Sequence, residues 1–472
     1  MNVDARPKII GAAVQRREDP RLLTGQGRFV DDINLPRMLH IAFCRSDHAH
    51  ARVLEVDVAA AAAMPGVVAI FTGADVLGTF NPIRATSRMA DYYATELPVL
   101  AHDKVCYVGE AVAAVVAESR YLAEDAAECI AVSYELLGHA VDVQANAEPG
   151  GPLLHEDAGT NVIVSRSFQR GDADGAMADA AVRVGATFRM HRKTPAALEN
   201  RGYVADYDPG RRALTLHSTT QVPGIVRDAL EEMLEIPGNR LHVMAPDIGG
   251  GFGGKASLYP EEVLVCLLSR RLGRPVKWIN TRSDSFLGDT HGRGQTSRVQ
   301  LAINNDGTFL ALRTETVGGI GAYCWTIGPF TPTGGSARTQ GGPYTFPTMY
   351  YRGRAVFTNT APMDPYRGAG RPEATFQTER IIEYAARKLG LDPVEIRRKN
   401  LMPPEALPFK SPMGMAIDCG DFPLLFERTL EMAEPGAFAA RAEKAIKAGR
   451  LFGFAIAPYL ECTGGAPKEY AG

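Results

Sequence analysis

The sequence predicts an α+β protein of two domains, and three observations lead to this prediction. Strand-like and helix-like patterns alternate from residue 21 to residue 142, and a second series of strands begins near Val182. Within that series, a glycine-rich loop joins a strand to a helix. The 472 residues, 45% of them hydrophobic, supply enough apolar surface for more than one core.

The first domain is predicted to span residues 21–142, after an N-terminal segment of residues 1–20. Apolar and β-branched residues predict three strands, and Ser119 has the side chain to cap a helix that follows it. The predicted strands are 67–71, 110–117 and 130–135, and the predicted helix is 121–128.

The second domain is predicted over residues 182–472, after a linker of residues 143–181 that is rich in Gly, Asp and Ala. Asp306-Gly307 predicts a hairpin turn, and the Gly and Pro clusters of residues 328–347 predict extended loops. Gly390 ends one predicted helix and Asp392 begins the next. The predicted strands are 184–190, 213–217, 241–245, 299–304 and 309–317, and these two helices are 372–389 and 394–400.

The glycine loop has the sequence Gly-Gly-Gly-Phe-Gly-Gly-Lys over residues 249–255. Glycine lets a backbone approach a ligand closely and adopt positive φ, and the following helix, predicted over residues 259–272 with Ser257 as its cap, favours anions at its amino end. Pro260 suits the first turn and Gly273 the end of this helix. The loop is therefore a predicted cofactor cradle.

Two nucleotide-binding patterns also match the loop. Gly249, Gly254 and Lys255 fit the phosphate-loop pattern, but Ala256 lacks the hydroxyl that would hold magnesium. Gly249, Gly251 and Gly254 fit the dinucleotide fingerprint, but no strand with an acidic ribose ligand follows at about 20 residues. A nucleotide-phosphate enzyme that uses this loop stays an alternative.

Composition excludes other classes of function. A net charge of −3 gives no broad basic surface for nucleic acid or membranes. Residues 1–10 lack the apolar core of a signal peptide and no apolar run would span a bilayer, so we expect a cytoplasmic location. The seven cysteines form no C-x-x-C pair, which predicts reduced, mostly buried thiols and no iron–sulfur cluster or structural zinc in this chain. We expect His48 and His50 to form hydrogen bonds on a strand face instead of a metal site.

Three separated segments carry the functional prediction: residues 217–221, the glycine loop, and residues 365–371. Gln221 offers an uncharged amide that can donate to an oxo group or a pterin edge. Arg367, flanked by Gly368, offers a fork of donors for a phosphate or a pterin carbonyl.

Together these segments closely resemble the molybdenum-binding large subunit of the xanthine dehydrogenase and aldehyde oxidase family. They resemble it in their order along the chain, their amino-acid sequences and their spacing. Residues 27–32 and 45–51 also resemble the family's amino-terminal a/b hammerhead domain, so the resemblance covers nearly the whole chain. It implies a hammerhead domain followed by the first molybdopterin-binding domain. The amino-acid sequence of residues 366–371 resembles that of cysteine-free homologues of carbon monoxide dehydrogenase large subunits.

The resemblance implies a molybdenum–molybdopterin cofactor, in the cytosine dinucleotide form, and a hydroxylase that takes oxygen from water. Electrons would pass to 2Fe-2S and FAD centres on a small and a medium partner subunit. By position, Gln221 would contact the apical oxo ligand and Arg367 would brace the cofactor. The loop residues implied to line the cofactor are Gly250, Gly251, Phe252 and Gly253.

Departures from the family pattern bear on the substrate. Purine-oxidising relatives carry a glutamate at the position of Ala256 and a phenylalanine at that of Ala369. Carbon monoxide dehydrogenases carry a copper-binding cysteine where this chain has Gly368. An aldehyde or an N-heteroaromatic compound is therefore the expected substrate.

The family's catalytic glutamate lies in a second molybdopterin-binding domain, which we expect beyond residue 472. Glu199, Asp247 and Glu373 lie near the motifs, but a structural role is expected for each. The chain alone is therefore expected to be inactive, as a truncated product or, less favoured, a split subunit. An assembly module that binds partners without metal is the non-enzyme alternative.

Overall fold

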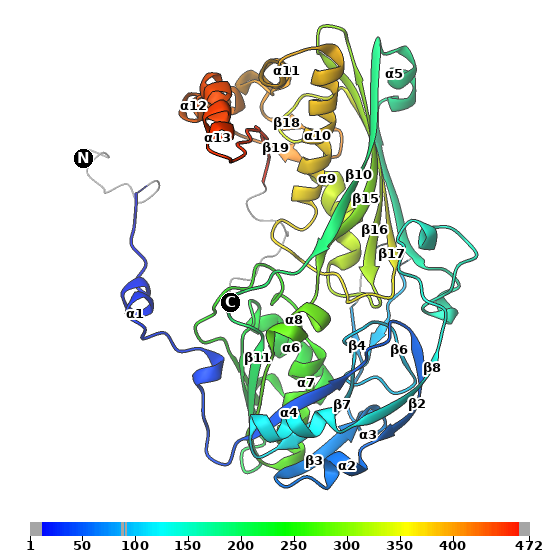
Figure 1. The fold of residues 1–472 in the computed structure, drawn as a ribbon, viewed down its shortest axis with the longest axis vertical. Helices are drawn as coiled ribbons and strands as arrows, with labels where there is room; N and C mark the ends of the chain where they lie inside the picture. Colours follow the sequence, from blue (N-terminus) through cyan, green and yellow to red (C-terminus); the bar gives the residue numbers. More distant parts are fainter. Residues whose placement is uncertain (1–11, 86–88, 90–91, 462–472) are drawn as a thin grey trace.

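The computed structural model describes residues 12–85, 89 and 92–461. These residues form two lobes, each built around one large sheet (Figure 1). Residues 1–11 and 462–472, which include Cys462, lie outside the described residues.

The first lobe contains a seven-stranded sheet whose order crosses the predicted domains. Strand β1, from the predicted hammerhead region, pairs in parallel with β14, which follows the glycine loop in sequence. The order is β13 (Leu241–Met244), β12 (Ala213–Ser218), β11 (Gly202–Asp208), β14 (Val276–Ile279), β1 (Leu39–Arg45), β7 (Ala111–Ala117) and β3 (Val67–Thr72). The predicted boundaries at residues 142 and 182 stay a prediction, and this sheet joins the segments on either side of them.

Helices and small sheets complete this lobe. Helix α7 is buried over nearly its whole length because it packs against β11 and β14. The helices are α2 (Ala59–Ala62), α3 (Gly73–Val76), α4 (Arg120–Glu128), α6 (Pro223–Leu234), α7 (Pro260–Leu272) and α8 (Arg282–Gly288), and the short helix α1 (Asp19–Leu23) stands apart from the lobe in Figure 1. The small sheets contain β6 (Lys104–Val105), β2 (Ala51–Asp57) and β8 (Ala131–Leu136), and β4 (Ile83–Arg84) with β5 (Glu96–Leu97).

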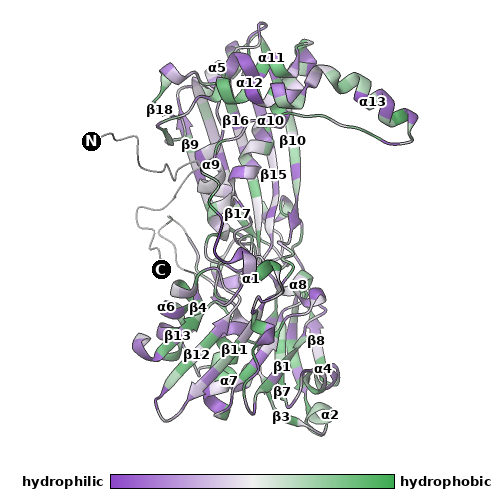
Figure 2. Ribbon diagram, turned by 90° about the vertical axis from the view of Figure 1, so that its left-hand side faces the viewer, coloured by the Kyte–Doolittle hydropathy of each residue, from purple (hydrophilic) through white to green (hydrophobic). Residues whose placement is uncertain are grey.

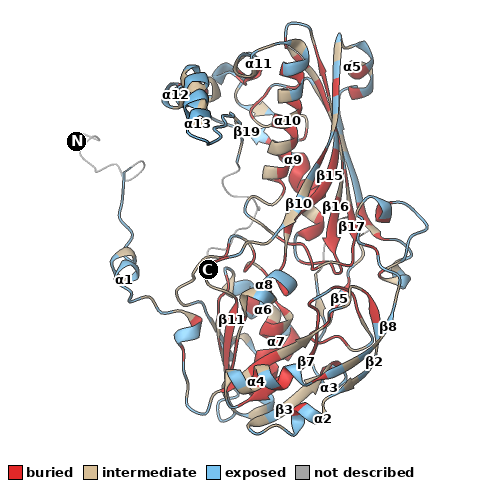
Figure 3. Ribbon diagram, viewed as in Figure 1, coloured by how far each residue is buried: buried red, intermediate tan, exposed pale blue. Residues whose placement is uncertain are grey.

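The second lobe is a five-stranded sheet of long strands covered by α10 (Figures 1 and 3). The order is β10 (Val182–Lys193), β15 (Gly292–Ile303), β16 (Phe309–Gly321), β17 (Thr348–Phe357) and β9 (Val162–Arg170). The remaining elements are α5 (Ala173–Asp179), α9 (Ser336–Thr339), α10 (Arg371–Leu389), α11 (Pro393–Asn400), α12 (Phe422–Ala433), α13 (Phe438–Lys447), β18 (Phe409–Lys410) and β19 (Ala416–Ile417). In Figure 2, α13 extends away from the body of the molecule.

Short 3-10 helices and one π-helix connect these elements. The 3-10 helices are Val30–Asp32, Ala145–Ala147, Glu156–Ala158, Gly238–Arg240, Gly328–Phe330, Pro404–Ala406 and Pro435–Ala437, and the π-helix is Thr331–Gly335.

Local signals predicted several elements correctly. Ser119 accepts a hydrogen bond from Leu122 N at the start of α4, and Asp392 accepts one from Val394 N at the start of α11. Gly390 ends α10 in the left-handed conformation. Gly307, with φ of +86°, forms the turn between β15 and β16. These signals depend only on neighbouring residues, which is why the sequence reveals them.

Two predicted irregular regions contain regular structure. The predicted linker of residues 143–181 includes β9, which pairs with β17 at the edge of the second sheet, and also α5. Residues 328–347, predicted as extended loops, begin with helical turns that run from Gly328 to Thr339. An edge strand needs only one apolar face, and Pro is tolerated in the first turn of a helix, so composition misled both predictions.

Other local predictions also need correction. Ser257 does not cap α7: its Oγ bonds Asp364 and Thr326, and Tyr259 is the N-cap. His48 and His50 lie in the irregular segment between β1 and β2 instead of on a strand face. Among the described cysteines, all free thiols, Cys129 and Cys419 are exposed, so burial of most cysteines was predicted too broadly.

The described residues contain neither a helix that could span a membrane nor a metal-binding cluster of side chains. None of their helices has both the length and the apolar character needed to cross a bilayer. Within the same part of the chain, His, Cys, Asp and Glu side chains form no group of three or more that could hold a metal ion.

Candidate functional site

The glycine loop leaves β13 and enters α7, and its backbone follows conformations that favour glycine. Gly250 and Gly253 have φ of +98° and +97°, and Phe252 between them has φ of +53°. A non-glycine residue in this region is strained. Phe252 nevertheless keeps 45% of its surface exposed, at the tip of the loop.

Most of the loop glycines are required by neighbouring protein atoms. A Cβ on Gly249 would lie 2.4 Å from Glu199 Cβ, and one on Gly251 would lie 2.3 Å from Gln221 Oε1. A Cβ on Gly253 would lie 2.4 Å from the Pro365 carbonyl oxygen. The loop is therefore the place where several distant segments pack together.

Gln221 is fixed against the loop by its own side chain. Its Oε1 accepts hydrogen bonds from Gly253 N at 2.9 Å and Lys255 N at 3.4 Å, and its backbone N donates to Lys255 O at 2.8 Å. Gln221 is exposed at the end of the segment that leads from β12 to α6. Its amide nitrogen has no partner among the described residues, so it stays free to donate.

The segment before α10 meets the loop from the other side. Arg367 N donates to Phe252 O at 3.0 Å. Arg293 holds the segment in place by donating to Arg367 O at 2.8 Å and to Tyr366 O at 3.2 Å. The Arg367 residue is exposed. The three segments predicted to act together thus converge, and each has an exposed residue there: Gln221, Phe252 and Arg367.

The donor groups left at this surface fit an anionic, oxygen-rich cofactor. The backbone N–H groups of Gly250, Gly251 and Phe252 have no hydrogen-bond partner among the described residues. Consecutive free N–H groups form a concave donor set of the kind that binds anions. Together with the Gln221 amide and the Arg367 guanidinium, they give the chemistry that a molybdopterin group requires.

Lys255 does not serve as a phosphate-binding lysine. It is only 4% exposed, and its Nζ donates to Glu199 O at 2.9 Å and Glu199 Oε2 at 3.1 Å. Burial lowers the pKa of Lys255, and the Glu199 carboxylate opposes this effect. Because the ammonium group is committed to Glu199, the phosphate-loop alternative is wrong.

The three carboxylates near the motifs are occupied by structural contacts. Glu199 also accepts from Gly249 N at 2.7 Å. Asp247 pairs with Arg21, whose hydrogen bond lowers the pKa of Asp247 to about 2. Glu373 is fully buried, pairs with Arg293 at 3.0 Å and accepts from Gly370 N at 2.9 Å.

Sequence reasoning missed the buried residues that support the glycine loop. Tyr259 Oη donates to Gly254 O at 2.7 Å, and the guanidinium of Arg201 lies 3.7 Å from the Tyr259 ring centre. Burial opposes ionisation of Glu261, but Arg201 and Arg45 lower its pKa to about 2. Arg201 and Arg45 lie far from residues 259–261 in the sequence, so no local pattern predicts these contacts.

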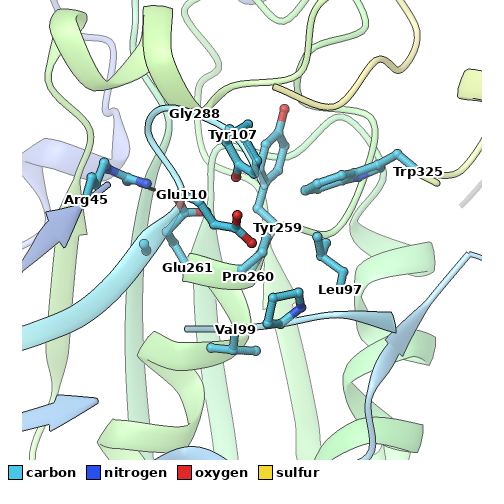
Figure 4. A pocket seen from close by; sticks show the side chains of 12 residues that line it. Arg45, Leu97, Val99, Tyr107, Glu110, Tyr259, Pro260, Glu261, Gly288 and Trp325 are labelled. Atoms are coloured by element: carbon cyan, nitrogen blue, oxygen red, sulfur yellow. Dashed lines mark hydrogen bonds and ion pairs between the residues drawn. The ribbon is translucent and has the colours of Figure 1, made fainter. Parts of the chain in front are cut away.

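Figure 4 shows a small hollow in this buried layer, with a volume of about 10 Å³. Glu110 lines it and receives hydrogen bonds from Tyr323 Oη and Cys106 N, each at 2.6 Å. Burial raises the pKa of Glu110 to about 7. None of the predicted site residues lines this hollow, so it is distinct from the candidate site.

Comparisons with known proteins identify the family to which this chain belongs. Residues 154–401 match the family described as molybdopterin cofactor-binding domain, and residues 24–138 match the a/b hammerhead domain of aldehyde oxidase and xanthine dehydrogenase. The nicotine 6-hydroxylase large subunit of Paenarthrobacter nicotinovorans is 36% identical over 466 residues, which cover 97% of this chain and 56% of that protein. The chain belongs to the xanthine dehydrogenase and aldehyde oxidase family. The predicted α+β fold, a hammerhead domain followed by a molybdopterin-binding domain, is confirmed.

The chain is also similar to a carbon monoxide dehydrogenase subunit and to the solved structure of a quinoline oxidoreductase. The carbon monoxide dehydrogenase large chain of Afipia carboxidovorans is 34% identical over 483 residues, with 98% of this chain and 59% of that protein covered. The crystal structure of quinoline 2-oxidoreductase from Pseudomonas putida 86 matches with a TM-score of 0.87 and 40% identity, over 93% of this chain and 56% of that one. The chain thus spans a little over half the length of these relatives.

Proposed function

We propose that this chain is the cofactor-holding part of a molybdenum hydroxylase large subunit that oxidises an N-heteroaromatic or aldehyde carbon. The observation that carries the proposal is the meeting of Gln221, the free N–H groups of the glycine loop and the Arg367 segment at one exposed surface. When bound, the molybdenum cofactor supplies two-electron oxidation, with water as the source of oxygen.

The residues of this chain orient and hold the cofactor. Gly253 N fixes the Gln221 carbonyl, so the amide N–H is directed away from that bond and can donate to an oxo ligand. Arg367 offers up to five donors to the pterin or its phosphate. The exposed Phe252 ring gives an apolar cover beside these polar groups.

The N-heteroaromatic class is the better supported substrate class. Two of the relatives are named for nicotine and quinoline, which are N-heteroaromatic compounds. Gly368 follows Arg367 where the copper-binding cysteine of carbon monoxide dehydrogenases would stand, and Ala256 and Ala369 lack the groups expected for a purine. These residues argue against carbon monoxide and xanthine.

The catalytic base and the partner subunits belong to the same proposal. All three nearby carboxylates make structural contacts, so a glutamate outside this chain supplies the base. The cofactor is the cytosine dinucleotide form, and electrons leave through an iron–sulfur small subunit and an FAD-binding medium subunit.

Metal and nucleotide analysis of the assembled enzyme tests the proposal. The chain is produced together with the remaining large-subunit region, and molybdenum is measured by mass spectrometry and CMP after acid hydrolysis. We expect about equal amounts of molybdenum, CMP and chain, and a loss of both in Arg367→Ala. Arg352→Ala, which removes another exposed arginine, on β17, is the matched control. Folded protein that assembles with its partners and holds no molybdenum would instead identify an assembly module.

A further inference from the structure

A buried layer of the second lobe contains glutamine side chains with unused hydrogen-bonding groups. It lies between β15 and β16 on one side and α9 and α10 on the other, and Figure 3 shows much of these strands in the colour of buried residues. Gln295, Gln340 and Gln377 are each 3% exposed or less. Four of their amide atoms have no hydrogen-bond partner among the described residues. These atoms are Gln295 Nε2, Gln295 Oε1, Gln340 Oε1 and Gln377 Oε1.

Hydrogen bonds place Gln340 and Gln377 against the same two strands. Gln377 Nε2 donates to Ser297 Oγ at 2.8 Å, and Ser297 Oγ lies 2.9 Å from Thr316 Oγ1. Gln340 Nε2 donates to Thr314 Oγ1 at 3.1 Å. Thr314 and Thr316 are two residues apart on β16 and so point to the same face of the sheet. The two amides therefore lie in one layer.

Gln295 belongs to the same layer. It precedes Ser297 by two residues on β15, so both side chains point to the face that α10 covers. Gly318 stands opposite Gln295 on β16. A Cβ on Gly318 would lie 3.8 Å from Gln295 Cβ and 2.5 Å from Pro332 Cβ, which places Gln295 beneath the π-helix that carries Pro332.

Polar side chains occupy only one end of this layer. The other end is filled by apolar residues of one buried core cluster, among them Val299, Leu301, Leu312, Ile381 and Ile382. A buried amide without a partner is unfavourable, and an apolar side chain of similar size would avoid that cost. The glutamines at the polar end therefore indicate a bound polar partner.

The unused groups select the chemistry of that partner. Gln295 leaves both a donor and an acceptor without a partner. Either orientation of the Gln340 and Gln377 amides leaves one atom of each unpartnered. A cation would satisfy only the oxygen atoms, whereas a water molecule donates and accepts and can satisfy every one of these atoms.

We infer that this layer is a binding site for internal water, in which about two water molecules bridge β15 to α9 and α10 through Gln295, Gln340 and Gln377. The number follows from the roughly three hydrogen bonds that a buried water molecule makes. All four unpartnered atoms are buried within this chain. The inference is therefore independent of the proposed function.

A crystal structure of the enzyme, purified from its own host and solved at a resolution that shows ordered water, tests the site directly. We expect electron density for water within hydrogen-bond distance of all three amides. A second crystal, grown with rubidium in place of sodium and potassium, separates water from a monovalent cation, since only bound rubidium gives an anomalous peak. A rubidium peak at these amides, or density without water there, overturns the inference.

Gln295→Met tests the site in solution, because Met is similarly long and flexible and removes both unpartnered atoms. If water binds the amide, the variant loses water-mediated hydrogen bonds, and its melting temperature should fall by roughly 2–4 °C. If the amide binds nothing, removal of two unsatisfied atoms should raise the melting temperature instead. Gln300→Met is the matched control, because Gln300 lies on the opposite face of the same strand and is partly exposed. A melting temperature of Gln295→Met at or above that of the control overturns the inference.

Discussion

Two glycine-rich regions of this chain have opposite relations to their surroundings. The loop of residues 249–254 is open on one side, where Phe252 is 45% exposed and three consecutive N–H groups have no partner among the described residues. Residues 328–342 are almost entirely buried and form helical turns against the second sheet. Glycine density alone therefore does not distinguish an open loop with unpaired donors from a buried element that the glycines pack.

Residues 328–342, the closed region, also support the open loop of residues 249–254. Gly335 packs so closely on the Arg367 segment that a Cβ would lie 2.9 Å from Ala369 O. Asp364 accepts hydrogen bonds from Ile327 N at 3.0 Å and from Ser257 Oγ, and thus joins the two regions. The glycines of the closed region fix the position of the segment that carries Arg367, and those of the open loop leave room for a ligand.

The largest effect is expected at Arg293, which holds the segment that carries Arg367. Arg293→Met leaves the fully buried Glu373 without its counter-charge and releases the carbonyls of Tyr366 and Arg367. Urea unfolding is expected to show a loss of about 3–5 kcal/mol. The Arg293→Met, Glu373→Gln double variant should recover part of this loss, and a single-variant loss below about 1 kcal/mol would contradict the role of the pair.

A methyl group in the closed region should be nearly as damaging. In Gly328→Ala the added Cβ would lie 2.1 Å from the Met363 carbonyl oxygen, and backbone atoms on both sides must shift. We expect a loss of about 3 kcal/mol in the free energy of unfolding. Gly436→Ala is the matched control, because Gly436 also lies in a 3-10 helix without positive φ and has no neighbour within 4 Å of the added carbon. Equal losses in the two variants would show that the close approach of Met363 O does not decide the effect.

These contacts explain what sequence reasoning could reach. The glycine loop, Gln221 and Arg367 each lie in a short contiguous segment with a distinctive amino-acid sequence. Their chemistry and their resemblance to the family could therefore be inferred from the sequence. Arg293, Asp364 and the pairing of β1 with β14 depend on partners far away in the chain, and a single sequence does not show such partners. The role of most loop glycines was also hidden, because their close neighbours are protein atoms from other segments.

Asp364, which accepts hydrogen bonds from Ile327 N and Ser257 Oγ, should make the free energy of unfolding depend on pH. Burial raises the pKa of Asp364 from 3.8 to about 6, so between these values the folded protein binds a proton that the unfolded chain has released. Stability should therefore fall as the pH rises from about 4 to 7. Glu110 and Glu262, whose pKa values burial raises to about 7, act in the same direction.

Asp364→Asn isolates the contribution of this junction. The difference in unfolding free energy between wild type and variant should change by about 1–2 kcal/mol between pH 4 and pH 7, always in the direction that weakens the wild type at the higher pH. Urea unfolding at several pH values measures it. A difference that does not vary with pH would show that Asp364 keeps an ordinary pKa in the folded chain.

The smallest effect on stability is expected at the tip of the open loop. Phe252→Ala removes a ring that is 45% exposed and leaves the strained backbone at φ of +53° unchanged, so the loss should stay below about 1 kcal/mol. Molybdenum content or turnover of the assembled enzyme should fall much more than stability does, because the ring stands beside the free N–H groups. Tyr121→Ala, at a residue that is 77% exposed on α4, is the matched control for loss of a surface ring. If Phe252→Ala behaves like this control in both measurements, the open face of the loop does not hold the cofactor, and the contrast between the two glycine-rich regions is one of packing alone.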